Sequence, residues 1–282
     1  MIQRDFHNPA AIRSFIEQAL NEDIGDGDIT TKSSFNNDIS GVAHCFVKEK
    51  CTIAGVALAI QICNYLDPQL EVNFSCKDGD VIEDVPVCIG VMSGKLSSIL
   101  QIERLLLNAM QRMSGIATLT NTYVQKLNGY RTKILDTRKT TPNFRLLEKQ
   151  AVAIGGATNH RFGLYDMIML KDNHIDYAGG ITQAVNKAFD YVCSNNYNLK
   201  IEVETRNIKD VEEVCNNCIG KVDRIMLDNF SPEQITAALK IIDQKIETEA
   251  SGGINLDTIL DYAATGVDYI SVGGLIHQAK SL

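Results

Sequence analysis

Residues 223–274, DRIMLDNFSPEQITAALKIIDQKIETEASGGINLDTILDYAATGVDYISVGG, repeat one simple unit. A short β-rich run comes first, a turn rich in charge or glycine follows, and a helical segment leads to the next run. The runs are residues 223–227, 245–249 and 268–272. Strands that alternate with helices in this way are typical of βα units, whose strands lie parallel in one sheet.

The same rhythm extends back to residue 132. Three further runs precede these: TKILD at 132–136, MIML at 167–170 and KIEV at 200–203. A complete (β/α)8 barrel would need two more strands than these six. We therefore predict an α/β fold whose parallel sheet is either an incomplete, open barrel or a barrel closed by strands that the sequence does not reveal.

The first part of the chain mixes helix and strand without a regular repeat. Asn8 followed by Pro9 predicts a helix over residues 9–20, because asparagine caps a helix and proline suits its first turn. Residues 40–48, 69–75 and 86–92 have the pattern of strands in a small mixed sheet. A long helical stretch with an apolar face then begins after Ser93 and Gly94. We expect the chain to divide near residue 112.

Composition excludes several classes of protein. The 282 residues contain 27 Lys and Arg against 35 Asp and Glu, a net charge of -8. Such a chain is a poor nucleic-acid binder, because counterion release rewards basic surfaces. No apolar run approaches the ~18 residues that cross a bilayer, and the N-terminus lacks a secretory pattern. We expect no nucleic-acid partner and no membrane partner.

Eight cysteines are scattered along the chain. Without a secretory context they are best interpreted as free thiols in a reducing cytoplasm, which is the location that we expect. Cys215 and Cys218 form the one CxxC pair, but two further zinc ligands at suitable spacing are missing nearby.

Polar residues follow the β-rich runs at the point where each strand should end. The carboxyl ends of the strands of a parallel barrel meet on one face, where active sites are built. These residues should therefore converge in one pocket. They are Arg138 and Lys139 after the first run, Lys171 after the second, Glu204 after the third, Asp228 after the fourth, Ser251, Gly252 and Gly253 after the fifth, and Gly273 and Gly274 after the sixth.

Two features of this set indicate an anionic ligand. Glycines after the last two strands let backbone N–H groups and a helix N-terminus approach a phosphate. Cations gather at or between the first two strand ends, and guanidinium groups suit carboxylate and phosphate. Without carboxylates to balance their charge these cations would repel one another, so binding of a polyanionic ligand best explains why they are clustered. The cations are Arg138, Lys139, His160, Arg161 and Lys171.

Several long strings carry a resemblance to a known family. They are EDIGDGDITT (22–31), AGVALA (54–59), ERLLLNAMQRMSGIAT (103–118), LDTRKTTPNFRLLEKQAVAIGGATNHRFGLYDMIMLKDNHI (135–175), IEVET (201–205), IMLDNF (225–230), EASGGI (249–254) and GVDYISVGGLIH (266–277). Together they span nearly the whole chain, and the combination of DTRKTTP, NHR and LKDNH is highly specific. The sequence resembles quinolinate phosphoribosyltransferase, also called nicotinate-nucleotide pyrophosphorylase (carboxylating).

The resemblance implies a fold and a reaction. The fold is an N-terminal α/β sandwich domain over residues 1–112, with the tail 276–282 packing back on it, and an incomplete α/β barrel over residues 113–275. The reaction converts quinolinate and phosphoribosyl pyrophosphate into nicotinate mononucleotide, pyrophosphate and carbon dioxide, with Mg2+, in NAD biosynthesis. The resemblance also implies a homodimer with shared active sites, which could assemble further.

Matching positions carry over the family's site residues. Quinolinate would be bound by Arg138, Lys139, His160, Arg161 and Lys171, and by Arg104 supplied from the partner subunit. The ribose and phosphate end would use Glu204, Asp228, Ser251, Gly252, Gly253, Gly273, Gly274 and His277. The catalytic group would comprise Lys139, Lys171, Glu204 and Asp228, and the last two would hold magnesium directly or indirectly.

Two rival hypotheses remain open. A nicotinate phosphoribosyltransferase has a similar barrel, but a substrate with one carboxylate needs fewer cations than this chain supplies. A non-catalytic binder of a phosphorylated metabolite would bind the same ligands without turnover. On spacing alone, His160 and His277 could equally be core histidines.

Overall fold

The computed structural model describes residues 8–35 and 39–282, which form two compact units. One unit contains the described residues up to 121 together with 141–156 and 278–282, and the other contains 122–140 and 157–277. The segments of the two units thus alternate along the chain. The boundary predicted near residue 112 falls inside a helix, α4 (Leu96–Lys126).

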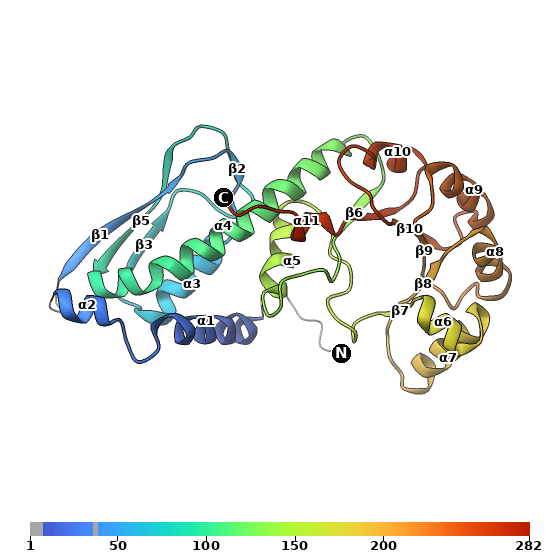
Figure 1. The fold of residues 1–282 in the computed structure, drawn as a ribbon, viewed down its shortest axis with the longest axis horizontal. Helices are drawn as coiled ribbons and strands as arrows, with labels where there is room; N and C mark the ends of the chain where they lie inside the picture. Colours follow the sequence, from blue (N-terminus) through green and yellow to red (C-terminus); the bar gives the residue numbers. More distant parts are fainter. Residues whose placement is uncertain (1–7, 36–38) are drawn as a thin grey trace. The chain divides into compact units, whose positions relative to one another are not determined.

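A six-stranded parallel sheet organises the second unit, in the order β6-β11-β10-β9-β8-β7 (Figure 1). Because β6 and β7 form its two edges, the barrel is open, as the sequence predicts. Each of the six strands predicted for this sheet is present, with its ends displaced by at most two residues. The strands are β6 (Lys133–Leu135), β7 (Ile168–Leu170), β8 (Ile201–Thr205), β9 (Arg224–Asp228), β10 (Glu247–Ser251) and β11 (Tyr269–Ser271).

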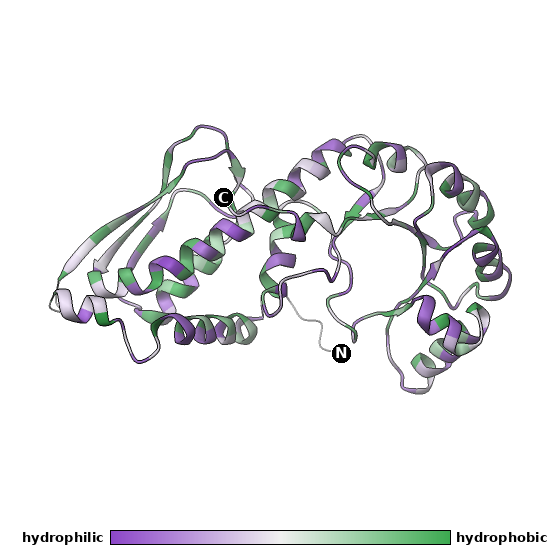
Figure 2. Cartoon of the chain, viewed as in Figure 1, coloured by the Kyte–Doolittle hydropathy of each residue, from purple (hydrophilic) through white to green (hydrophobic). Residues whose placement is uncertain are grey.

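Helices that follow the strands β7 to β10 line the outer face of this sheet, and α11 follows the last strand, β11 (Figure 1). Their ribbons alternate between hydrophobic and hydrophilic residues, as expected for helices with one face on a sheet (Figure 2). Local signals fix their ends: Ser231 and Gln234 form a capping box, with Pro232 in the first turn of α9. The helices are α6 (Asp172–Ala178), α7 (Ile181–Ser194), α8 (Ile208–Asn217), α9 (Pro232–Ile242), α10 (Ile259–Ala264) and α11 (Gly274–His277).

The first unit is built on an antiparallel sheet in the order β1-β5-β3, and β2 pairs with β4. The predicted helix cap is confirmed, since the Asn8 side chain accepts hydrogen bonds from the N–H groups of Ala10 and Ala11. The elements are α1 (Pro9–Ile24), α2 (Ile29–Ser34), β1 (Ser40–Val47), β2 (Cys51–Thr52), α3 (Val56–Leu66), β3 (Glu71–Phe74), β4 (Val81–Ile82), β5 (Val87–Lys95), α4 and α5 (Arg145–Ile154).

The C-terminal residues 278–282 lie along α4 within this same unit. Arg112 Nη1 donates to the carbonyl oxygen of Ala279 at 2.7 Å, and the N–H of Leu282 donates to the carbonyl oxygen of Gln111 at 3.2 Å. Gly115 makes this approach possible, because a Cβ at that position would collide with the carbonyl oxygen of Lys280.

Two further findings concern the chain as a whole. Within the described ranges, no helix combines the length and the apolar character that crossing a bilayer requires. All eight cysteines, Cys215 and Cys218 among them, are free.

Candidate active site

The predicted polar residues do gather at one end of the parallel sheet. Glu204 lies in β8 opposite Met226 of β9, and Asp228 at the end of β9 lies opposite Ser251 at the end of β10. Gly273 and Gly274 follow β11 directly. Because all these strands run in the same direction, their carboxyl ends place these residues at the same edge of the barrel.

Two carboxylates and one ammonium group form the acidic part of the site. Lys171 Nζ donates to Glu204 Oε2 at 2.7 Å, so this lysine already forms an ion pair with a carboxylate. Burial and then the charge of Glu204 raise the pKa of Asp228, against the lowering effects of Lys171, Asn229 and Ser251. Glu204 is almost fully buried and Asp228 is half-buried. Two such carboxylates held close together offer hard oxygen ligands to a divalent cation.

The loop after β10 requires glycine for a geometric reason. Gly252 has a φ of +106°, and a Cβ there would lie 2.2 Å from the side-chain oxygen of Asn229. The Asn229 N–H in turn donates to the Ser251 carbonyl oxygen at 2.8 Å, which holds the two loops together. The position beside Gly253 is open space. The chain therefore presents an uncovered backbone turn here, of the kind that admits a phosphate.

Two basic side chains approach Gly273. A Cβ built on this glycine would lie 3.1 Å from Lys139 Cδ and 3.2 Å from His277 Nε2. Lys139 follows β6 and Gly273 follows β11, and these two strands are neighbours in the sheet. The structure thus brings Lys139, Gly273 and His277 together at the carboxyl end of the barrel. His277 is exposed, which excludes the alternative of a core histidine.

Arg138 and Arg161 form a pair of neighbouring guanidinium groups. Burial lowers the pKa of Arg161, and the positive charge of Arg138 lowers it further, against the raising effects of Glu202 and Asp166. Arg161 Nη1 donates to the carbonyl oxygen of Met167 at 3.2 Å, whereas Arg138 Nε is buried without a hydrogen-bond partner. Neither guanidinium forms an ion pair with a carboxylate among residues 8–35 and 39–282. Arg138 and Arg161 are therefore available to bind an anionic ligand.

Asp136 and His160 hold the backbone next to Arg161 in place. Asp136, buried just after β6, accepts the N–H of His160 at 2.7 Å and the side-chain N–H of Asn159 at 2.7 Å. His160 Nε2 lies 3.1 Å from Glu202 Oε2 and 3.3 Å from Glu249 Oε2. Burial of the ring lowers the pKa of His160, but the nearby carboxylates of Glu202 and Glu249 raise it more.

Sequence reasoning missed three members of this arrangement, namely Asp136, Glu202 and Glu249. Asp136 and Glu249 close two of the predicted strand runs, and Glu202 stands in the middle of a third. Buried carboxylates need partners, so an acidic residue inside a buried strand was the available signal. Arg104 lies on the exposed side of α4, and its predicted contribution to a partner subunit stays a prediction.

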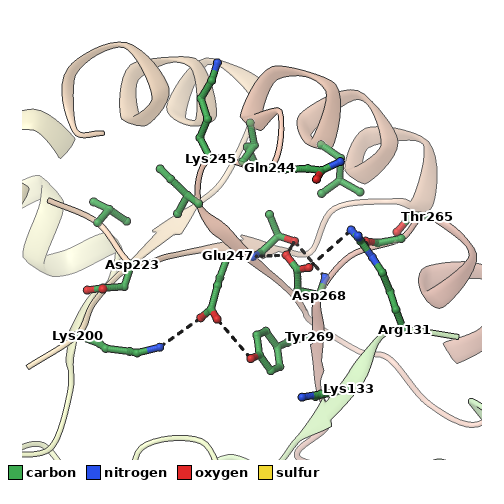
Figure 3. Close-up of a pocket in the computed structure, with 16 residues that line it drawn as sticks. Arg131, Lys133, Lys200, Asp223, Gln244, Lys245, Glu247, Thr265, Asp268 and Tyr269 are labelled. Atoms are coloured by element: carbon green, nitrogen blue, oxygen red, sulfur yellow. Dashed lines mark hydrogen bonds and ion pairs between the residues drawn. The ribbon is translucent and has the colours of Figure 1, made fainter. Parts of the chain in front are cut away.

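A hollow of about 850 Å³ lies at the opposite, amino end of the same strands (Figure 3). Two of its cations are paired with acids of the same hollow: Arg131 with Asp268 at 3.6 Å and Lys200 with Glu247 at 3.5 Å. The amino end of a barrel generally serves stability rather than catalysis. We therefore place the active site at the carboxyl end, where cations remain unanswered.

Comparison with known proteins agrees with this geometry. Residues 28–114 match the family model of the quinolinate phosphoribosyl transferase N-terminal domain, and residues 116–282 match that of the C-terminal domain. The chain belongs to the quinolinate phosphoribosyltransferase family.

Relatives in this family match over almost the full chain. The quinolinate phosphoribosyltransferase [decarboxylating] 1b of Nicotiana tabacum is 42% identical over 98% of this chain and 82% of its own length. A probable nicotinate-nucleotide pyrophosphorylase [carboxylating] of Bacillus subtilis is 40% identical over 98% of this chain and 92% of its own. The solved nicotinate-nucleotide pyrophosphorylase of Francisella tularensis superposes with a TM-score of 0.88 at 39% identity, covering 96% and 94% of the two chains.

Proposed function

We propose that this chain transfers the phosphoribosyl group of phosphoribosyl pyrophosphate to the ring nitrogen of quinolinate. Carbon dioxide is lost, and nicotinate mononucleotide and pyrophosphate are formed, as a step of de novo NAD biosynthesis. The observation that carries the proposal is the pair of neighbouring guanidinium groups, Arg138 and Arg161, neither of which forms an ion pair with a carboxylate of the described residues. A ligand with two adjacent carboxylates supplies the missing anions.

Quinolinate binds at the cationic part of the site in this proposal. Arg138 and Arg161 hold its two carboxylates, and the exposed Lys139 adds a third positive charge beside Gly273. Lys171 binds both Glu204 and the ligand, and so joins the quinolinate end to the acidic end. The unpaired Arg138 and Arg161, with Lys139 in addition, favour quinolinate over nicotinate, which has one carboxylate.

The phosphoribosyl group occupies the other part of the same edge. The backbone turn at residues 251–253 and the start of α11 at Gly274 present N–H groups to the sugar phosphate. Glu204 and Asp228 lie between these loops and Lys171, where they hold ribose hydroxyls. His277 completes the phosphate end over Gly273.

The chemistry follows from the charges that these residues hold in place. The ring nitrogen attacks the anomeric carbon while the bond from that carbon to pyrophosphate breaks, and positive charge develops on the sugar. Glu204 and Asp228 offset that charge without reorganising. The quaternised nitrogen then stabilises the electron pair that remains when the neighbouring carboxylate leaves as carbon dioxide, and a proton fills the vacated ring carbon.

Glu204 and Asp228 also fit a role in binding magnesium. The raised pKa of Asp228, caused by burial and by the charge of Glu204, indicates two carboxylates whose repulsion a divalent cation would relieve. When bound, magnesium would offset the charge of the departing pyrophosphate. Asn229 and Lys171 keep the two carboxylates in place from outside.

The full site requires a homodimer in this proposal. Arg104 on the exposed side of α4 is the residue that each subunit contributes to the active site of its partner. A further positive group from outside the chain suits a dicarboxylate that already faces Arg138 and Arg161. The eight free cysteines support a reducing compartment such as the cytoplasm.

Turnover tests the proposal directly. The purified protein is incubated with magnesium, phosphoribosyl pyrophosphate and either quinolinate or nicotinate, and both carbon dioxide and mononucleotide are followed. We expect both products with quinolinate and neither with nicotinate. Turnover of nicotinate would favour the rival transferase, and ligand binding without any product would favour a non-catalytic binder.

A further inference from the structure

The interior of the barrel contains a group of four charged side chains that the proposed reaction does not use directly. Glu202 of β8 and Glu249 of β10 are fully buried, and His160 and Arg224 are less than a tenth exposed. Barrel interiors are mostly filled by branched apolar residues. Buried charges are costly even when they are paired, so this group calls for a physical reason.

The group is connected to the candidate quinolinate pocket through one imidazole ring. Nε2 of His160 faces Glu202 and Glu249, and Nδ1 accepts the backbone N–H of Arg161 at 2.7 Å. Asp136 holds the backbone N–H of His160 itself. The orientation of the ring therefore fixes the backbone from which the Arg161 side chain extends.

His160, Glu202 and Glu249 could also be considered as metal ligands, because one ligand atom from each lies within 4.8 Å of the others. The hydrogen bonds argue for a proton instead. Since Nδ1 accepts an N–H, Nε2 is the nitrogen that carries the hydrogen, and it lies 3.1 Å from Glu202 Oε2. Arg224 Nη1 already donates to Glu249 Oε2 at 3.2 Å and supplies the positive charge that a metal would bring.

Arg224 is itself fixed by contacts away from the pocket. Its Nη2 donates to Glu247 Oε2 at 3.3 Å, and its guanidinium lies 4.1 Å from the centre of the Tyr269 ring. Among the described residues, His160 is the one side chain with a nitrogen within 4.0 Å of a Glu202 carboxylate oxygen. The two buried glutamates thus have different neighbours but share the imidazole.

We infer that Glu202 and Glu249 are positioning residues, which hold the His160 ring so that Arg161 stays beside Arg138 in the quinolinate pocket. His160 acts in the same way, through the backbone of Arg161, because both of its ring nitrogens are engaged by protein groups. This inference rests on the proposed function, since it assigns quinolinate to the pair of arginines. Groups that orient a ligand-binding residue typically affect affinity by about 10- to 100-fold.

The strand that carries Glu249 also provides a matched control. Glu247 lies two residues earlier in β10, contacts the same Arg224 and does not contact His160. We expect Glu249→Gln to raise the KM for quinolinate by about 10-fold or more, with the KM for phosphoribosyl pyrophosphate changed less than about twofold. Glu247→Gln should leave both constants unchanged. Equal changes in both constants for Glu249→Gln, or an equal effect of the two variants, would overturn the inference.

A double-mutant cycle separates positioning from general damage to the fold. If Glu249 acts through His160, the variant carrying both Glu249→Gln and His160→Gln should bind quinolinate no worse than His160→Gln alone. Fully additive losses would contradict the inference. Glu202→Gln, tested in the same cycle, keeps the experiment informative if Glu249→Gln does not fold. The proposed function fails separately, since it fails if the unmodified protein does not release carbon dioxide from quinolinate.

Discussion

Individual side chains determine which ligand this site selects. Arg138 and Arg161 form no ion pair with a carboxylate among the described residues, whereas Lys171 is paired with Glu204. At the amino end of the same strands, Arg131 and Lys200 are each paired with acids. A cation without a carboxylate partner indicates an anionic ligand more strongly than the number of cations does. A cation that is already paired with a carboxylate does not need a ligand to balance its charge.

The first prediction concerns these two arginines. Arg138→Ala and Arg161→Ala should each raise the KM for quinolinate by about 10- to 1,000-fold, since each removes a charge-assisted bond worth roughly 1.5–3 kcal/mol and loosens the remaining contacts. The KM for phosphoribosyl pyrophosphate should change much less. Steady-state kinetics with each substrate varied in turn provide the check. An equal loss for both substrates would remove the two arginines from the quinolinate pocket.

Asp228 allows a prediction about stability as well as activity. Because burial and Glu204 raise its pKa, its charged form destabilises the folded state, and this cost grows as the pH rises through the pKa of the unfolded chain. Asp228→Asn should therefore raise the Tm at pH 7 by about 1–3 °C while turnover falls by about 100-fold or more. Thermal unfolding of both proteins in magnesium-free buffer at pH 7 and pH 4 tests this. The gain should shrink at the lower pH, and a lower Tm for the variant at pH 7 would contradict it.

The secondary-structure elements show how far the sequence can be interpreted. Six strands, the cap at Asn8 and the open edge of the barrel are predictable, because hydrophobic runs and turn residues are local signals. The return of residues 141–156 and 278–282 to the first unit is not local, since contacts such as Arg112 with Glu148 join distant positions. The buried group of Glu202, Glu249 and Arg224 was missed for the same reason, because its partners come from three different strands.

The packing of the C-terminal residues on α4 yields a third prediction. Gly115→Ala places a methyl group against the backbone of Lys280, so it should destabilise the protein by about 1–3 kcal/mol. A chain ending at His277 lacks the colliding residues and should lose much less from the same substitution. Chemical denaturation of the four proteins in this cycle measures the coupling. An equal cost in both chain lengths would show that Gly115 is needed for another reason.

At the scale of the whole molecule, two inactive variants of the proposed dimer should restore activity to each other when their subunits are mixed. Arg104→Ala and Lys171→Ala should each be inactive alone, because one removes the residue lent to the partner and the other removes a residue of the subunit's own site. After subunit exchange, half of the dimers are mixed and each mixed dimer has one intact site, so about a quarter of the normal activity should return. Absence of recovery after exchange has been verified would argue against shared sites.

The account as a whole rests on one chemical claim, that transfer to the ring nitrogen precedes and causes the loss of the neighbouring carboxylate. Quinolinate labelled with 13C in the carboxyl group next to the nitrogen tests this claim most directly. In the presence of enzyme, magnesium and phosphoribosyl pyrophosphate, we predict one labelled carbon dioxide for each mononucleotide formed, and none when phosphoribosyl pyrophosphate is omitted. Labelled carbon dioxide without the sugar substrate, or mononucleotide that retains the label, would contradict it.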